Sequence, residues 1–232
     1  STLGAGRDFW WDALTRVFLT TPSLPDTLEL TTPQGVQVWH LGAGAQCSAA
    51  DLRLLAAARM PFDVRLHPRI RVMNQVRDAM FPALPDEIER LCTDVCAWAG
   101  VDRAGPSGDH PMTPEGLQRL AASGLVEIGA HTVSHRPLDL LAPDEALAEM
   151  AGSRKALREV IDREIRTIAY PYGRYSAAVT PVLAAEAGFD AACTTDEWIA
   201  IGPVNPFRFP RFTVRDWDGD QFARILRQFA GA

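Results

Sequence analysis

The chain has 232 residues, a formal charge of -6 and an apolar fraction of 47%, which is enough for a packed core in one large or two small domains. The acidic balance argues against a nucleic-acid partner, because proteins that bind DNA or RNA usually carry a basic face. No apolar run approaches the roughly 20 residues that cross a bilayer, so we expect no membrane span.

Residues 1–110 form a mostly helical region with one β-hairpin in our prediction. The hairpin is expected at 28–30 and 36–39, because these short apolar segments flank the turn sequence Thr-Pro-Gln-Gly. Gly, Pro and charged residues make 102–110 the most linker-like stretch. Apolar residues at helical spacing predict helices over residues 8–19, 48–59, 69–81 and 86–99.

Residues 111–232 change to a regular alternation of strands and helices. Strands are predicted at 126–130, 167–170, 190–194 and 209–214, and helices at 113–123, 143–161, 177–187 and 219–229. Such alternation is typical of parallel βα units. We therefore expect an α/β fold, with the βα units confined to this second region.

The four cysteines are predicted to be free, buried thiols: Cys47, Cys92, Cys96 and Cys193. They form no Cys-x-x-Cys motif, and Cys92 and Cys96 lie four apart in a helical pattern, on one face. Free thiols favour a reducing compartment such as the cytoplasm. Residues 1–7 have neither the basic start nor the apolar stretch of a signal peptide.

His131 and His135 are the first candidate functional residues. Two imidazoles four apart can face the same way on a helical turn, about 5–6 Å apart at Cβ, as two ligands of one zinc-type ion would. His131 also follows directly on a predicted strand, where functional groups of βα folds cluster. The chain has five histidines, so the spacing also fits a chance pair without a metal. Because no Glu follows His131, a general base must come from elsewhere.

A turn sequence, Tyr-Pro-Tyr-Gly at 170–173, ends the next predicted strand. Its glycine permits a tight turn close to a ligand, and a backbone N–H there could donate to a developing oxyanion. An ordinary strand-to-helix turn explains the same residues.

Arg211, Asp216 and Trp217 lie at the end of the last predicted strand. An aromatic face can stack on a sugar ring, and charged side chains can hold its hydroxyl groups. Asp216 or Asp218 fits equally well as the cap of the last helix. The remaining histidines are predicted to be structural or solvated: His40, His67 and His110.

Taken together, these segments resemble the polysaccharide deacetylase family, carbohydrate esterase family four. The family's His-[Ser/Thr]-x-x-His motif is matched by residues 131–135, and its preceding Glu-Ile-Gly-small strand by residues 127–130. The Pro-Tyr-Gly motif is matched in part by residues 170–173. The helix at 177–187, followed by Gly-Phe and a strand, also fits, so that the resemblance covers residues 113–195.

The resemblance implies metal-dependent hydrolysis of an N-acyl group, usually acetyl, from an amino sugar of a polysaccharide or oligosaccharide. It implies that His131 and His135 hold a divalent ion, with zinc as the expected metal, and that the backbone N–H of Tyr172 binds the oxyanion. Saccharide contacts are expected from Pro171, Arg211, Asp216 and Trp217. The implied fold is an irregular (β/α) barrel, with residues 1–110 as a helical insertion.

The chain also departs from the family pattern. It has no Thr-Phe-Asp-Asp-Gly motif, which supplies the third metal ligand and the base, and no His follows His135. It therefore reads as a barrel lacking its N-terminal strands, with an exposed sheet edge suited to self-association or to a partner. Three readings stay open: a metal-dependent deacetylase, an inactive homologue that binds saccharide or assembles with a partner, and a structural domain without zinc.

Overall fold

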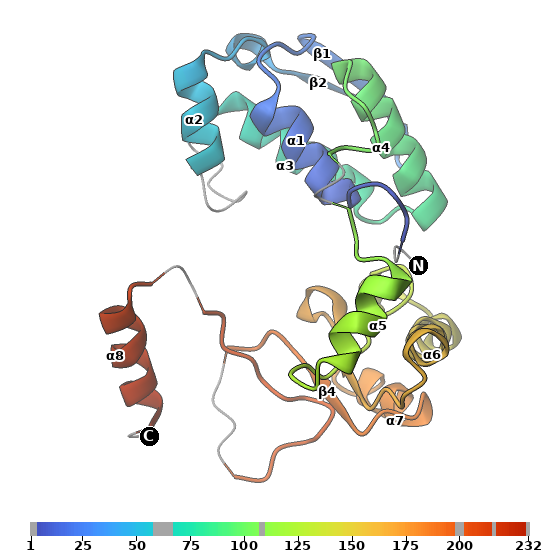
Figure 1. Ribbon diagram of the computed structural model, residues 1–232. Helices are drawn as coiled ribbons and strands as arrows, with labels where there is room; N and C mark the ends of the chain where they lie inside the picture. Colours follow the sequence, from blue (N-terminus) through green and yellow to red (C-terminus); the bar gives the residue numbers. More distant parts are fainter. Residues whose placement is uncertain (1–3, 58–66, 107–109, 198–201, 215–216, 231–232) are drawn as a thin grey trace. The chain divides into compact units, whose positions relative to one another are not determined.

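The computed structural model describes residues 4–57, 67–106, 110–197, 202–214 and 217–230 (Figure 1). The chain divides into two compact units, Thr2–Met112 and Thr113–Ala232. We placed the boundary after residue 110. None of the described helices is long and apolar enough to cross a membrane.

The first unit packs helices around an apolar core and against a β-hairpin. Helix α1 lies against α3 and α4, and its residues Leu14, Val17 and Phe18 are buried, which confirms the helical spacing of its apolar residues. The elements of this unit are α1 (Trp10–Thr20), β1 (Thr27–Thr32), β2 (Gly35–His40), the 3₁₀ turn η1 (Gly42–Ala45), α2 (Ala49–Ala57), α3 (Pro68–Met80) and α4 (Pro85–Ala99).

The predicted hairpin is present and longer than expected. Strands β1 and β2 pair antiparallel, with Thr27 opposite His40 and Thr32 opposite Gly35. Leu28 and Leu30 are buried while their neighbours in β1 are exposed, as expected for a strand with one face on a core.

Arg69 is fully buried at the start of α3, which its charge did not predict. Desolvation lowers the pKa of this guanidinium. Its N–H groups donate to the backbone carbonyls of Phe18, Thr21, Pro22, Gly44 and Ala45. The side chain thus satisfies carbonyls in the last turn of α1, just after this helix and along η1, and these bonds offset the cost of burying the charge.

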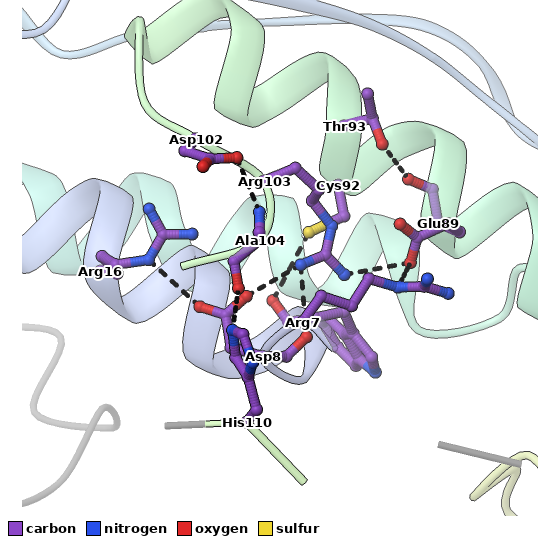
Figure 2. Close-up of polar contacts among 11 residues, drawn as sticks. Arg7, Asp8, Arg16, Glu89, Cys92, Thr93, Asp102, Arg103, Ala104 and His110 are labelled. Atoms are coloured by element: carbon purple, nitrogen blue, oxygen red, sulfur yellow. Dashed lines mark hydrogen bonds and ion pairs between the residues drawn. The ribbon is translucent and has the colours of Figure 1, made fainter. Parts of the chain in front are cut away.

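A buried carboxylate anchors part of the stretch that resembled a linker (Figure 2). Asp8 accepts hydrogen bonds from Arg16 Nε at 3.1 Å and from Arg103 Nη1 at 2.9 Å. Arg103 Nη2 reaches Glu89 on α4 at 3.0 Å, and the Asp8 N–H donates to the Ala104 carbonyl. Residues 103 and 104 are therefore fixed to the first unit.

All four cysteines are free, as predicted. Cys92 and Cys96 are fully buried on α4. The prediction of burial is wrong for Cys47 and Cys193, which are half-buried.

The second unit contains parallel β segments alternating with helices, which confirms the α/β class. Strands β3 and β4 pair in parallel, with Ile168 opposite Ala192. Ala130 forms a parallel bridge to Ile168, and Phe209 forms one to Cys193, so four segments lie side by side in chain order. The elements are α5 (Pro114–Ala122), the 3₁₀ turn η3 (Leu138–Leu140), α6 (Pro143–Ile161), β3 (Thr167–Ala169), the turn η4 (Pro171–Gly173), α7 (Thr180–Glu186), β4 (Ala191–Cys193) and α8 (Gly219–Ala230).

The predicted outer strands at 126–130 and 209–214 are wrong as strands, because each is reduced to a single bridge. Each of these segments has a described β neighbour on one side only. Leu125 is 90% exposed and Val126 44% exposed. Burial in this segment begins only at Ile128, which is partly buried against the core, and Ala130, which is 2% exposed. The strands of the described residues close no barrel, and the barrel stays a prediction.

Candidate functional site

The two histidines of the 131–135 segment meet at the end of the first parallel segment. The ring centroids of His131 and His135 lie 4.7 Å apart, with the ring planes at 74°. The segment is not the helical turn that the spacing suggested: Thr132 and His135 have left-handed φ angles of 66° and 60°. Two backbone reversals, rather than helical periodicity, bring the rings together.

A backbone carbonyl orients the first histidine. His131 Nδ1 lies 2.7 Å from the carbonyl oxygen of Ala169, the last residue of β3. Because a carbonyl oxygen can only accept, Nδ1 carries the proton and the lone pair of the ring is on Nε2. Ligating histidines commonly make this outer hydrogen bond, which fixes the tautomer and the ring direction.

The surroundings of both rings favour the neutral imidazole. Desolvation lowers the pKa of His131, and the nearby Arg211 cation lowers it further against the opposing effect of the Ala169 carbonyl. Desolvation, followed by the charge of His131, lowers the pKa of His135 to about 4. Neutral imidazole is the form that binds a metal ion.

The Pro-Tyr-Gly turn places Tyr172 beside this pair. Its ring centroid lies 4.6 Å from that of His135, in an edge-to-face arrangement. Tyr172 and Gly173 have φ angles of 57° and 67°. A Cβ on Gly173 would lie 1.7 Å from Thr195 Oγ1, so only glycine fits this turn. Pro171, which we expected to contact saccharide, is buried in the turn.

The structure describes two of the three C-terminal candidates, Arg211 and Trp217. Arg211 donates from Nε to the Thr194 carbonyl at 2.7 Å and is close enough to affect His131. Trp217 stacks on Phe212 with a centroid distance of 5.8 Å. Asp216 lies outside the described residues.

Several other polar residues have structural contacts instead. The Gln221 N–H donates to Asp218 Oδ1 at 2.8 Å, so Asp218 caps α8. His67 Nδ1 accepts from the Arg69 N–H at the start of α3. His40 and His110 also make hydrogen bonds, to Thr27 Oγ1 and to the Ala104 carbonyl.

The described residues offer two imidazoles as possible metal ligands. They do not offer a complete ligand set. Among them, no group of three or more His, Cys, Asp or Glu side chains is placed to hold an ion. Catalytic zinc usually takes three protein ligands and a water. His131 and His135 therefore fit two of the ligand positions, and a third ligand would come from outside the described residues.

The sequence did not reveal that Glu149 binds the segment between the two histidines. This residue of α6 accepts the N–H groups of Val133 and Ser134, both at 2.8 Å. Arg174 and Asp139 form a second link, since Arg174 Nη2 lies 2.7 Å from Asp139 Oδ2 and joins η3 to the segment after η4. Charged residues on a helix and in a turn look like solvated surface, so no local signal identified either link.

Known proteins share sequence and structure with part of this chain. Residues 96–192 match the family model described as polysaccharide deacetylase. Over 105 residues the chain is 32% identical to "Putative polysaccharide deacetylase YxkH" of Bacillus subtilis (strain 168). The matched residues are 45% of this chain and 37% of that protein.

Two solved structures are similar over about half of the chain. The Streptococcus pyogenes deacetylase PplD in complex with acetate is 28% identical, with a TM-score of 0.43, over 45% of this chain and 46% of that chain. BC0361, a polysaccharide deacetylase from Bacillus cereus, is 21% identical, with a TM-score of 0.44, over 50% of this chain and 37% of that chain. This chain spans less than half the length of each of these relatives.

Proposed function

We propose that this chain serves the hydrolysis of an N-acyl group, usually acetyl, from an amino sugar of a polysaccharide or oligosaccharide, because residues 96–192 match the family model described as polysaccharide deacetylase. His131 and His135 are the proposed ligands of a divalent ion, with zinc as the expected metal. The observation that carries this proposal is the contact of the two rings, with Nδ1 of His131 directed to the Ala169 carbonyl.

If His131 and His135 held such an ion, it would supply polarisation of the amide carbonyl and would lower the pKa of a water at the site to about 7. The residues of this chain would position the substrate and stabilise charge. The backbone N–H of Tyr172, beside His135, is the proposed donor to the oxyanion. Arg211, close to His131, and Trp217 are the proposed saccharide contacts. The third ligand, the base and the strands that complete a (β/α) barrel come, in this proposal, from outside the described residues.

The test measures metal content and hydrolysis together. Elemental analysis of the purified chain after incubation with zinc is expected to show zinc bound. Release of acetate from chitin oligomers is measured on the same sample and is expected only if residues outside the described ones supply the base. His131→Ala and His135→Ala should each abolish zinc binding and, with it, any acetate release. His40→Ala is the matched control, because this histidine lies on the hairpin of the first unit, and it should change neither.

Absence of both zinc and acetate release would contradict the proposal. In that case, binding of the unmodified oligomers would identify the chain as a saccharide-binding homologue without hydrolytic activity. Zinc binding without acetate release would retain the metal site and reject hydrolysis by this chain on its own.

A further inference from the structure

We propose that Glu149 is the positioning residue of the histidine pair: its carboxylate holds the segment between His131 and His135 in the conformation that brings the two rings together. The proposal rests on the proposed function only where it concerns a metal ion. The ring contact and the carboxylate contacts are independent of whether the chain is a hydrolase.

The carboxylate receives three donors from two consecutive residues. Glu149 Oε2 accepts the N–H groups of Val133 and Ser134, each at 2.8 Å. Glu149 Oε1 accepts the Ser134 hydroxyl at 2.5 Å. Hydrogen bonds to an ionised acceptor are shorter and stronger than neutral ones, so this side chain is a strong anchor for the segment.

The segment needs an anchor because its backbone is strained. Thr132 has a φ of 66° and His135 a φ of 60°, although neither is glycine. A β-branched residue in the left-handed region is a true outlier, and such conformations persist only where the surroundings fix them. The Thr132 hydroxyl gives one local bond, accepting the His135 N–H at 3.1 Å. From outside the segment, Ala169 binds the His131 ring and Glu149 binds the backbone between the two histidines.

The shape of α6 supports the same conclusion. Gly152 follows Glu149 by three residues and so lies on the same face of the helix. A Cβ at this position would lie 3.0 Å from Val133 Cγ2, which is tighter than ordinary packing. The helix therefore presents two features to the same segment: the Glu149 carboxylate binds it, and the missing side chain of Gly152 lets Val133 approach closely.

Glu149 acts on the histidine pair through the backbone that joins the two histidines. Glu149 makes these three bonds to Val133 and Ser134, which lie between the two histidines in the chain. Loss of its bonds would let the backbone at Thr132 and His135 leave the left-handed region, which separates the rings. Outer contacts of this type typically change metal affinity by about 10- to 100-fold.

The experiment compares Glu149→Ala, Glu149→Gln and Glu159→Ala in the full chain. Glutamine is the conservative variant, because its amide oxygen can accept both N–H groups and its amide nitrogen can donate to the Ser134 hydroxyl. Glu159 lies on the same helix with its side chain 65% exposed, so its substitution is the matched control. The measurements are amide hydrogen exchange at Val133 and Ser134, the nuclear Overhauser effect between the two imidazoles, and zinc affinity by chelator competition.

Glu149→Ala is expected to speed exchange of both amides about 10-fold or more and to remove the ring-to-ring effect. Zinc affinity should fall about 10- to 100-fold. Glu149→Gln, which keeps the acceptor but loses the charge, should lie between Glu149→Ala and the wild type in every measurement, whereas Glu159→Ala should stay near the wild type. Unchanged exchange and an unchanged ring contact in Glu149→Ala would overturn the proposal. So would unchanged zinc affinity in a variant whose amides exchange faster.

If the wild-type chain binds no zinc, the metal site of the proposed function fails, and the exchange and ring measurements still decide the role of Glu149. If Glu149→Ala does not fold, Ser134→Ala replaces it, since this variant removes only the hydroxyl bond. It should speed exchange of the two amides about fivefold, and no change would overturn the proposal.

Discussion

The ring of Tyr172 stands edge-on to the ring of His135, with the centroids 4.6 Å apart and the planes at 79°. The two residues follow neighbouring parallel segments, because Ala130 bridges to Ile168 of β3. The contact therefore joins two chain segments at the carboxyl ends of adjacent β segments, where functional groups of α/β folds gather.

Removal of the Tyr172 ring should weaken this junction. We expect Tyr172→Ala to lower the free energy of unfolding by about 1 kcal/mol, through loss of the aromatic pair. Tyr172→Phe keeps the ring and should retain the contribution of the aromatic pair in urea unfolding. Because the proposed oxyanion donor is the backbone N–H, Tyr172→Phe should also retain acetate release, and a loss there would assign a role to the phenol instead.

The pH dependence of stability should report the buried imidazole. An unfolded histidine has a pKa of about 6.5, whereas that of His135 is lowered to about 4 by desolvation and then by His131. Between these values the unfolded chain binds a proton that the folded chain does not. The free energy of unfolding of the metal-free protein should therefore be fully present above pH 6.5 and fall as the pH decreases from about 6.5 to about 4. His135→Asn should reduce this fall in urea titrations, and an equal fall would attribute it to other groups.

Gly173 should tolerate no side chain. Gly173→Ala adds a Cβ 1.7 Å from Thr195 Oγ1 and is expected to cost about 3 kcal/mol or more. Gly124→Ala is the matched control, since Gly124 also has a left-handed φ of 72° but nothing within 4 Å of the added atom, and it should cost about 1 kcal/mol. Because the three atoms nearest to the added Cβ all belong to the Thr195 side chain, Thr195→Gly should rescue Gly173→Ala apart from the strain of its left-handed φ. No rescue in denaturant titrations would refute this packing.

The Asp8 carboxylate should be a major stabiliser of the first unit. Its side chain is 2% exposed and pairs with Arg16 and Arg103, which are 18% and 15% exposed. Asp8→Ala removes the carboxylate from the largely buried Arg16 and leaves Arg103 with Glu89 as its remaining ion-pair partner, and we expect it to lower the free energy of unfolding by about 3 kcal/mol or more. Asp94→Ala removes an exposed pair with Arg90 on α4 and should cost about 0.5 kcal/mol. Equal effects of the two substitutions would mean that the buried cluster adds no stability.

Sequence patterns identified the helices and the candidate pair because both depend on local order. Four of the described helices have proline as their first residue, at Pro68, Pro85, Pro114 and Pro143, where a missing N–H costs nothing. The apolar spacing of residues 8–19 and 86–99 was enough to predict α1 and α4. The short parallel segments were harder, because strand pairing depends on partners far along the chain and not on the letters of 126–130 or 209–214.

The sequence by itself determined that His131 and His135 would lie at the end of a β segment, because the two histidines directly follow that segment in the chain. Only the tertiary structure decided how they meet. Left-handed backbone at Thr132 and a carboxylate from α6 bring the rings together, and neither leaves a local signal. The same holds for the buried Arg69, whose acceptors are backbone carbonyls distant in sequence. Local periodicity reports which face of an element is apolar, whereas the partner of a polar group is chosen by the packing of the whole unit.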